Sequence, residues 1–321
     1  MKIGIVGDLH IAPIPEKRID DYFQTGLDKI EEIAQYCDWV IFTGDIFSKP
    51  RIDKELENRL IRHLSYCKER YKVLFATIIG NHDVSYEEEE YLKDSSLDTL
   101  SASNVMRIIT PSNPLVIADK YIYRFNTVPV KFSNAKDYLS YMRYSNEIQL
   151  RLGEMVDECI DILLIHHLYE TGNDCFTYKD FKDLGCKHIF LGHDHKPFDK
   201  GRIIYPEFTI YRSGSIMRNR SDDYNLSRQL YYFILENGQV TCQAVSTKPA
   251  ESVFKFESVV KLERHKEEYK ESINKIIDKY ENNINKQNKF SIKNILEEIK
   301  TPSEYMPYIE EKYEEQGESF V

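Results

Sequence analysis

The first part of the chain alternates short apolar runs with longer amphipathic segments. Three runs rich in β-branched residues predict buried strands over 2–7, 39–45 and 73–83. Between them, apolar positions recur with the 3.6-residue period of an amphipathic helix over 19–36 and 53–70. Because strands that alternate with helices usually form a sheet covered by those helices, the pattern predicts an α/β layered fold.

The middle of the chain is dominated by strand-like segments separated by turns. These segments are 115–118, 121–126, 160–165, 188–191, 208–212, 230–235 and 239–244. Asn237-Gly238 stands between the last two, and this dipeptide is typical of a tight β-hairpin. The last two segments are therefore expected to pair with each other.

The character of the sequence changes near residue 250. The stretch 246–252 reads as a linker, and 263–288 is charged and helical, with a narrow Tyr and Ile stripe at near-heptad spacing. A second, shorter helix is expected over 292–300. Two interpretations stay open for this region: a solvated helical tail packed on its own domain, or an element that docks on a partner protein.

The composition limits the partners of the chain. Its 321 residues include 43 Lys and Arg against 53 Asp and Glu, a formal net charge of −10. A nucleic acid would be repelled unless basic residues gather on one face, and bound metal ions would change the local sign of a site. No apolar run approaches the roughly 18–20 residues that span a bilayer, and the start of the chain lacks the pattern of a signal peptide. These features favour a cytoplasmic protein with no membrane partner.

The six cysteines form no C-x-x-C pair, and several lie in or beside apolar runs. Buried free thiols are therefore expected rather than disulfides or zinc sites. Free thiols suit a reducing compartment.

Five apolar runs end in side chains that can bind metals. Six of the nine histidines lie at these ends. In chain order the ends are Gly7-Asp8-Leu9-His10, Gly44-Asp45, Gly80-Asn81-His82-Asp83, His166-His167 and Gly192-His193-Asp194-His195. Each motif alone is common and would be read as a turn or as a satisfied histidine. Because the carboxyl ends of strands in an α/β sheet converge on one crevice, the five together predict a metal site.

The number and type of these donors favour two divalent cations. Four imidazoles, two carboxylates and an amide oxygen are too many ligands for one ordinary ion. Mixed nitrogen and oxygen donors suit Mn²⁺, Fe²⁺ or Zn²⁺ better than Ca²⁺ or Mg²⁺. Two ions about 3.5–4 Å apart can activate water and clamp a phosphate during in-line displacement. The expected chemistry is hydrolysis of a phosphoester.

Taken in order, D-x-H, G-D-x-F, G-N-H-D, H and G-H-x-H resemble the calcineurin-like metallophosphoesterase superfamily over about residues 1–215. "GDIFSKPR" (44–51), "LGHDHKP" (191–197) and "YRSGSIMRNRSDD" (211–223) are similar to segments of SbcD-type exonucleases, the nuclease subunits of double-strand-break repair complexes. The G-D-x-x-D-R-G form of protein Ser/Thr phosphatases is absent from 44–51.

The resemblance implies a layered β-sandwich flanked by helices over 1–215, a small cap domain over 216–256 and a helical partner-docking element over 257–321. It implies two cations, Mn²⁺ foremost, with Mg²⁺, Fe²⁺ and Zn²⁺ as alternatives. The implied ligands are Asp8, His10 and His195 for one cation, Asn81, His193 and one of the tandem histidines for the other, and Asp45 as a bridge.

The remaining polar residues of the motifs also receive roles from the resemblance. His166 directly follows the apolar run and is preferred to His167 as the ligand, with His167 left beside the site or at the surface. His82 would contact the scissile phosphate and act as general acid or orient the phosphate, and Asp83 would orient His82.

The function that the resemblance implies is a metal-dependent DNA exo/endonuclease in an SbcCD-like repair or recombination complex. Its partners would be DNA, an SMC-like coiled-coil ATPase bound through the C-terminal helices, and a second copy of the chain. Arg212, Arg218 and Arg220 are assigned to DNA phosphates because they cluster after the last ligand strand. Two alternatives stay open: a phosphatase or cyclic-nucleotide phosphodiesterase of the same superfamily, and a non-catalytic scaffold that keeps the metals for structure.

Overall fold

The computed structural model describes residues 1–13, 18–87, 89–152, 159–170, 174–218 and 230–255. Met1–Lys255 forms one compact unit. The helical docking element expected over 257–321 lies outside the described residues, and so does Arg220.

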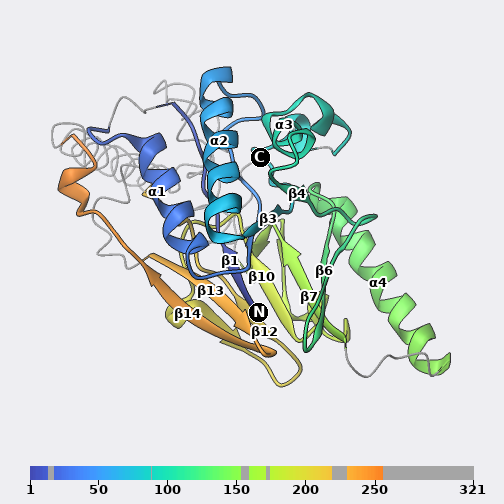
Figure 1. Cartoon of the computed structure of the whole chain (residues 1–321). Helices are drawn as coiled ribbons and strands as arrows, with labels where there is room; N and C mark the ends of the chain where they lie inside the picture. The colour runs from blue at the N-terminus through green and yellow to red at the C-terminus, as the bar shows by residue number, and fades with distance from the viewer. Residues whose placement is uncertain (14–17, 88, 153–158, 171–173, 219–229, 256–321) are drawn as a thin grey trace, which may run out of the picture. The chain divides into compact units, whose positions relative to one another are not determined.

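Two six-stranded mixed sheets make up the core of this unit (Figure 1). The first has the order β14 (Gln239–Val245), β13 (Leu230–Glu236), β1 (Lys2–Val6), β2 (Trp39–Phe42), β3 (Leu74–Thr77) and β4 (Arg107–Ile108). The second has the order β11 (Arg202–Ile204), β12 (Thr209–Tyr211), β10 (His188–Leu191), β7 (Cys159–Ile165), β6 (Ile122–Thr127) and β5 (Leu115–Ala118). A separate two-stranded ribbon pairs β8 (Leu168–Tyr169) with β9 (Cys175–Phe176).

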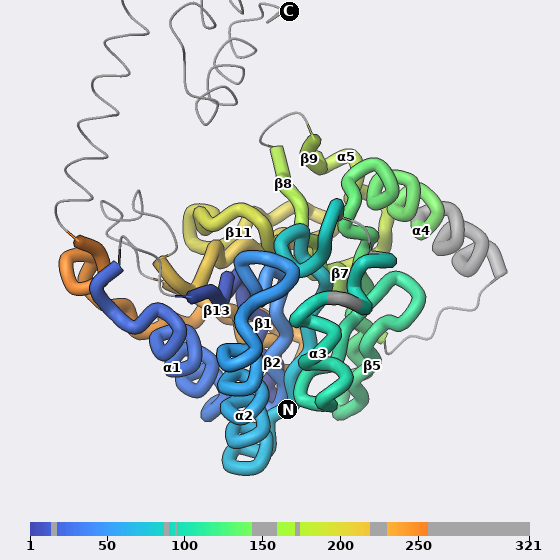
Figure 2. The backbone as a smooth tube through the Cα atoms, turned by 90° about the horizontal axis from the view of Figure 1, so that it is seen from above, coloured from blue at the N-terminus to red at the C-terminus, as the bar shows by residue number. Residues whose placement is uncertain are grey.

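Helices cover the outer faces of both sheets (Figures 1 and 2). They are α1 (Tyr22–Ala34), α2 (Lys54–Tyr71), α3 (Ser96–Ala102), α4 (Phe132–Leu152) and α5 (Tyr178–Phe181). Apolar side chains of α1, α2 and α3 pack on the first sheet, and those of α4 and α5 pack on the second. Short 3₁₀ turns occur at Ser85–Glu87, Glu89–Asp94, Asp199–Gly201 and Ala250–Ser252. The predicted α/β fold of layered sheets flanked by helices is confirmed.

The inner faces of the two sheets meet in an apolar core. Ile3 and Ile5 of β1 contact this core, as do Ile162 and Leu164 of β7. Alternate residues of a strand point to opposite faces, so the strands buried on both faces read as continuous apolar runs. This is why the short apolar runs were reliable signals for strands.

The predicted helices differ slightly from those observed. The first was expected from residue 19, but α1 begins at Tyr22, because the side chain of Asp21 accepts a hydrogen bond from the backbone N–H of Gln24 and caps the helix. Ile19 lies before the cap and is exposed. The long helix α4 was not predicted.

The stretch 216–256 does not form a cap separate from the sheets over its described residues. Strand β13 pairs antiparallel with β1, and β14 pairs with β13 through the hairpin that Asn237-Gly238 predicted. Both strands therefore extend the first sheet, and they belong to the same compact unit as the strands before residue 215. The physical reason is that β1 has an open edge on the side away from β2, and β13 supplies its hydrogen-bond partners.

All six cysteines are free, as predicted. Cys37, Cys67 and Cys186 are buried, whereas Cys242 is exposed. No helix among the described residues is both long and apolar enough to cross a membrane.

Candidate metal centre

The polar strand ends meet at one place. Loops that follow β1, β2 and β3 of the first sheet carry Asp8, Asp45 and Asn81, and loops that follow β7 and β10 of the second carry His166 and His193. Within the first sheet β1, β2 and β3 run parallel to one another, and within the second so do β7 and β10, so in each sheet their carboxyl ends lie at the same edge. The convergence that the sequence predicted is therefore present.

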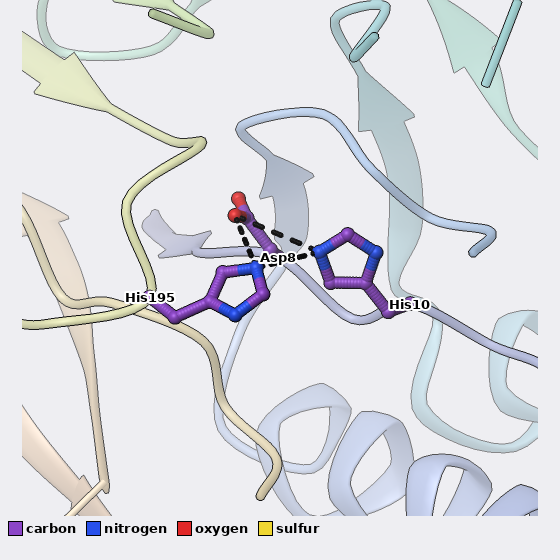
Figure 3. Close-up of side chains that lie close together, drawn as sticks. All are labelled: Asp8, His10 and His195. Atoms are coloured by element: carbon purple, nitrogen blue, oxygen red, sulfur yellow. Dashed lines mark hydrogen bonds and ion pairs between the residues drawn. The ribbon is translucent and has the colours of Figure 1, made fainter. Parts of the chain in front are cut away.

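Asp8, His10 and His195 form the first cluster of donors (Figure 3). The Nε2 atoms of His10 and His195 lie 2.8 Å apart. Oδ2 of Asp8 lies 4.0 Å from Nε2 of His10 and 3.7 Å from Nε2 of His195. Three donor atoms that face one point in this way have the arrangement of a cation site.

Asp45 connects this cluster to a second one. Its Oδ2 lies 3.5 Å from Nε2 of His10 and 3.2 Å from Nε2 of His166. Oδ1 of Asn81 lies 3.0 Å from Nε2 of His166 and 3.0 Å from Nδ1 of His193. Asp45 therefore stands between a cluster with His10 and a cluster with His166, which is the position that a bridging ligand requires.

The two tandem histidines point to opposite sides of the second sheet. His166 is buried, and its Nδ1 donates a hydrogen bond to the carbonyl of Thr43 at 2.7 Å, which leaves Nε2 facing Asp45 and Asn81. His167 instead donates from Nε2 to the carbonyl of Pro129 at 3.1 Å and packs against Phe132 and Phe176. The geometry therefore brings His166, and not His167, to the site.

His82 lies at the exposed rim of the centre. Its ring stands edge-on to that of His10, with the centroids 4.9 Å apart. Its backbone N–H donates to Oδ1 of Asp45 at 2.9 Å, and its Nδ1 lies 2.9 Å from the carbonyl of Ser48. A carbonyl oxygen can only accept a hydrogen bond, so Nδ1 of His82 must carry a hydrogen and donate it to Ser48. This leaves Nε2 of His82 available to a substrate.

Asp83 does not orient His82, contrary to the sequence-based expectation. The Asp83 carboxylate is buried and accepts hydrogen bonds from the backbone N–H groups of Phe47 at 3.1 Å and Gly80 at 3.0 Å. It therefore ties together the loops after β2 and β3. The carbonyl of Ser48 has the orienting role instead.

Several backbone conformations at the centre are costly. His10, Asp45 and His193 have φ angles of 52°, 49° and 77°, in the left-handed region that residues other than glycine rarely adopt. Such strain is characteristic of functional sites, where the surrounding structure holds it in place. Gly192 has no room for a side chain, because a Cβ atom would lie 2.7 Å from Nδ1 of His166 and 2.9 Å from Oδ1 of Asp8.

Burial and charge set the protonation of the donors. Burial, with the neighbouring Asp45, raises the pKa of Asp8 to about 7, although His166 opposes this shift. Burial lowers the pKa of His10 to about 3 and that of His193 to about 4, so both imidazoles are neutral at physiological pH.

The Asp45 and His166 pair behaves differently. Burial alone would neutralise both groups, but their mutual attraction wins, and it holds the pKa of Asp45 well below its usual range. The same attraction raises the pKa of His166 to about 10. A positive charge on Nε2 of His166 is therefore stabilised by the oxygens of Asp45 and Asn81.

The donor set fits a pair of divalent cations. Two carboxylates, an amide oxygen and neutral imidazoles are the ligands that Mn²⁺, Fe²⁺ and Zn²⁺ accept. Two of the three His and carboxylate clusters among the described residues contain Asp45, and two contain Asp8. The surroundings already favour positive charge at this place, as the shifted pKa of His166 indicates.

The residues that support the donors were mostly missed by the sequence reasoning. Thr43 and Ser48 act through backbone carbonyls, which no side-chain pattern reveals. The hydroxyl of Ser215 donates to the carbonyl of Asp8 at 3.0 Å. Ser215 lies in the "SGS" of the quoted 211–223 segment, which was the available signal for it.

Two of the three arginines assigned to DNA, Arg212 and Arg218, are buried. Arg212 is buried, its guanidinium lies over the ring of Phe198, and it forms an ion pair with Asp194 at 2.8 Å. Arg218 is also buried, and its carbonyl accepts a hydrogen bond from Arg18. Assignment of Arg212 and Arg218 to phosphate contact is therefore corrected, because a buried guanidinium does not present itself to a polymer in solvent.

Three solved structures resemble the fold weakly. A hypothetical protein from Thermus thermophilus has a TM-score of 0.43 and 11% identity, over 77% of this chain and 100% of the other. GAP50, the anchor in the inner membrane complex of Plasmodium, has a TM-score of 0.46 and 13% identity, over 79% and 87%. The calcineurin-like phosphoesterase YfkN from Bacillus subtilis has a TM-score of 0.38 and 14% identity, over 84% and 97%. No curated protein matches the chain.

The sequence itself matches a family more firmly. The profile of the calcineurin-like phosphoesterases matches residues 1–197, which is more than half of the 321 residues. The matched range holds all the donors described above, from Asp8 to His195, and this family consists of phosphoester hydrolases with a dinuclear metal site. The chain belongs to the calcineurin-like phosphoesterase family.

Proposed function

We propose that this protein is a metal-dependent nuclease that hydrolyses phosphodiester bonds in DNA. The observation that carries the proposal is the position of His82: an exposed imidazole at the rim of the metal centre, held by the Ser48 carbonyl. Cleavage of DNA expels an alkoxide oxygen. An alkoxide is more basic than a phenolate or a phosphate, so its departure depends more strongly on a proton from a general acid. An acid at an open rim suits a polymer that cannot enter a closed pocket.

The cations would be held by this chain's own side chains. Asp8, His10 and His195 would hold one, and Asn81, His166 and His193 the other, with Asp45 shared between them. When bound, a pair of divalent cations supplies a nucleophile near neutral pH and offsets negative charge on the phosphoryl oxygens.

His82 would provide the proton of the cleavage step. In its charged form, Nδ1 donates to the Ser48 carbonyl, and Nε2 donates its proton to the oxygen that leaves phosphorus. The P–O bond to that oxygen breaks as the oxygen of a water molecule forms the new bond to phosphorus, and the proton that this water loses passes to solvent. His82 is left neutral, with its remaining proton on Nδ1, and regains the second proton from solvent. The Ser48 carbonyl thus keeps the ring in one orientation through both states.

Exposed lysines beside the centre support a polyanionic substrate. Lys49 follows Ser48 in the loop that holds His82, and Lys196 follows His195. Both side chains are exposed, unlike Arg212 and Arg218. In an acidic protein, local positive charge at the mouth of the site is what a DNA strand needs in order to approach.

The partners belong to the same proposal. A nuclease of the SbcD type would act in the cytoplasm with an SMC-like ATPase bound through 257–321, as a homodimer. The short Tyr and Ile stripe of 263–288 supports burial against a partner helix. Size-exclusion of the full chain and of a chain ending at residue 255 with a candidate ATPase tests this: equal co-elution would remove 257–321 from the interface.

Cleavage of DNA tests the function. Four substrates are incubated with the full chain and Mn²⁺: linear duplex DNA, single-stranded DNA, the diester bis(p-nitrophenyl) phosphate and the monoester p-nitrophenyl phosphate. The variants His82→Gln and Asp45→Asn are assayed beside the wild type, with His63→Gln as a control. We expect DNA cleavage that falls about 10²–10⁴-fold in His82→Gln and disappears in Asp45→Asn, with His63→Gln unchanged. Turnover of small phosphomonoesters that far exceeds DNA cleavage would replace the proposal by a phosphatase, and metal binding without any hydrolysis would replace it by a scaffold.

A further inference from the structure

The turn that carries two donors, His193 and His195, is fastened by the residue between them. Oδ1 of Asp194 accepts a hydrogen bond from the backbone N–H of Lys196 at 2.9 Å. Oδ2 of Asp194 forms an ion pair with Nη1 of Arg212 at 2.8 Å. The Asp194 and Arg212 side chains are only 21% and 10% exposed, so solvent screens this pair weakly.

Arg212 itself is fixed in place. Its guanidinium carbon lies 3.9 Å from the centre of the Phe198 ring. Its backbone carbonyl accepts from the N–H of Phe198 at 3.1 Å, and its own N–H donates to the carbonyl of Gly201 at 3.0 Å. Because the backbone of Arg212 is hydrogen-bonded and its guanidinium is stacked on Phe198, the side chain loses little additional conformational entropy when it pairs with a carboxylate.

The residues after Arg212 support the same turn from behind. The backbone N–H of Ser215 donates to the carbonyl of His195 at 3.3 Å. The Ser215 hydroxyl donates to the carbonyl of Asp8 at 3.0 Å. Gly214, with a φ of 70°, lies so close to the carbonyl of His195 that a Cβ atom would clash with it. The segment 212–215 therefore contacts the turn and the loop of Asp8 at the same time.

The turn that carries His193 and His195 needs this support, because its backbone is strained. His193 has a φ of 77°, whereas in an extended chain His193 and His195 would point to one face together. The strained turn instead directs Nδ1 of His193 to Asn81 and Nε2 of His195 to His10. A strained backbone persists only where other contacts stabilise it. Here the Asp194 carboxylate supplies such contacts, through its hydrogen bond to the Lys196 N–H and its ion pair with Arg212.

We propose that Arg212 is a positioning residue of the metal centre. Acting through Asp194, it holds the turn in which His193 serves one cation and His195 the other. The ion pair also keeps the Asp194 carboxylate turned away from the donors, so that Asp194 does not become a ligand itself. The inference rests on the two-cation centre of the proposed function, and it adds a residue that makes no contact with cation or substrate.

Binding of Mn²⁺ to the purified full chain, followed by calorimetry, tests the proposal without reference to DNA. We expect Arg212→Gln to weaken Mn²⁺ binding about 10–100-fold, as the loss of a partner behind a metal ligand commonly does. Arg212→Lys keeps the charge but loses the planar contact with Phe198, and it should give a smaller loss. Arg202→Gln, an exposed arginine on the neighbouring strand β11, should bind like the wild type.

The pair is expected to act as a unit. Asp194→Asn combined with Arg212→Gln should weaken binding no more than the worse single variant, since each single change already removes the same contact. Circular dichroism of the metal-free variants shows whether they fold. If folded Arg212→Gln and Arg212→Lys bind Mn²⁺ within about twofold of the wild type, the inference fails. If the wild type binds no Mn²⁺, the metal centre of the proposed function fails instead.

Discussion

Nε2 of His10 and Nε2 of His195 face each other at 2.8 Å, although 185 positions separate the two residues in the chain. Burial lowers the pKa of His10 to about 3, so its ring is neutral over the whole physiological range. At this distance an N–H of one ring can donate to the lone pair of the other, and a cation bound by both facing lone pairs is the alternative arrangement. Asp8 lies beside both rings and supplies the charge that a cation needs (Figure 3).

Metal affinity should decrease as the pH falls through 7. Asp8 has a pKa raised to about 7 in the metal-free protein, so below that pH a cation must displace its proton. His166 has a pKa raised to about 10, so at every pH below that value a bound cation must displace its proton to solvent. His10 and His193 are already neutral above about pH 4 and add nothing.

Calorimetric titration with Mn²⁺ between pH 5 and 9 measures this dependence. The affinity should rise about tenfold per pH unit above pH 7 and more steeply below it, because one proton is released above pH 7 and two below it. An affinity that is constant from pH 5 to 8 would contradict the protonation states assigned to Asp8 and His166.

Replacement of Gly192 by Ala should disrupt the centre. A Cβ atom there would overlap the carbonyl of Thr43 and crowd His166 and Asp8, and these atoms are held too firmly to yield. We expect loss of Mn²⁺ binding and a lower melting temperature. Gly26→Ala in α1 is the matched control: its Cβ would lie 3.3 Å from Sδ of the flexible Met217 side chain and at ordinary contact distance, 3.8 Å, from Ile11.

In Gly26→Ala we expect unchanged metal binding and a stability within about 1 kcal/mol of the wild type, since Ala favours a helix over Gly. Thermal unfolding and Mn²⁺ titration of both variants check the pair. If both substitutions change Mn²⁺ binding and melting temperature equally, the close packing around Gly192 is not what maintains the metal centre.

Substitution of the two tandem histidines should have different effects, because His166 is a metal ligand in this account and His167 contributes only to stability. His166→Gln removes Nε2 from the centre and should abolish tight Mn²⁺ binding. His167→Gln removes the hydrogen bond to Pro129 and ring contacts on the other side of the sheet, which we expect to cost about 1–3 kcal/mol of unfolding free energy. Its metal binding should persist. The reverse pattern in a calorimetric titration would assign the donor to His167.

Lys49 and Lys196 should affect DNA cleavage but not the cleavage of a small diester. Alanine at either position should raise KM for DNA and reduce the dependence of DNA binding on salt by about one counterion, with bis(p-nitrophenyl) phosphate hydrolysis unchanged. Lys187→Ala is the control, because Lys187 is also exposed but precedes β10, at the opposite end of that strand from Lys196. If KM for DNA and the salt dependence change by the same amount in all three variants, DNA does not bind specifically at Lys49 and Lys196.

The strand ends could be predicted from the sequence for a simple reason. A strand buried on both faces is a continuous apolar run, so its last residue is visible, and parallel neighbours bring such ends together. The two-residue period also favours His166 over His167, since Ile162 and Leu164 share a face with His166 in the core between the sheets.

Other features had no local signal. Thr43 and Ser48 contribute carbonyls, which every residue possesses. Arg212 pairs with Asp194 through tertiary folding, and its sequence context suggested an exposed loop instead. The assignment of β13 to the first sheet depends on the free edge of β1. Among the side chains of α4 that the structure describes (132–142), the fully buried apolar members are Ala135 and Leu139.

A crystal of the protein grown with Mn²⁺, measured for anomalous scattering, tests the central claim most directly. The account predicts two anomalous peaks about 3.5–4 Å apart. One should lie within bonding distance of Asp8, His10 and His195, the other of Asn81, His166 and His193, and Asp45 should contact both. A single peak, or two peaks that Asp45 does not join, would contradict it.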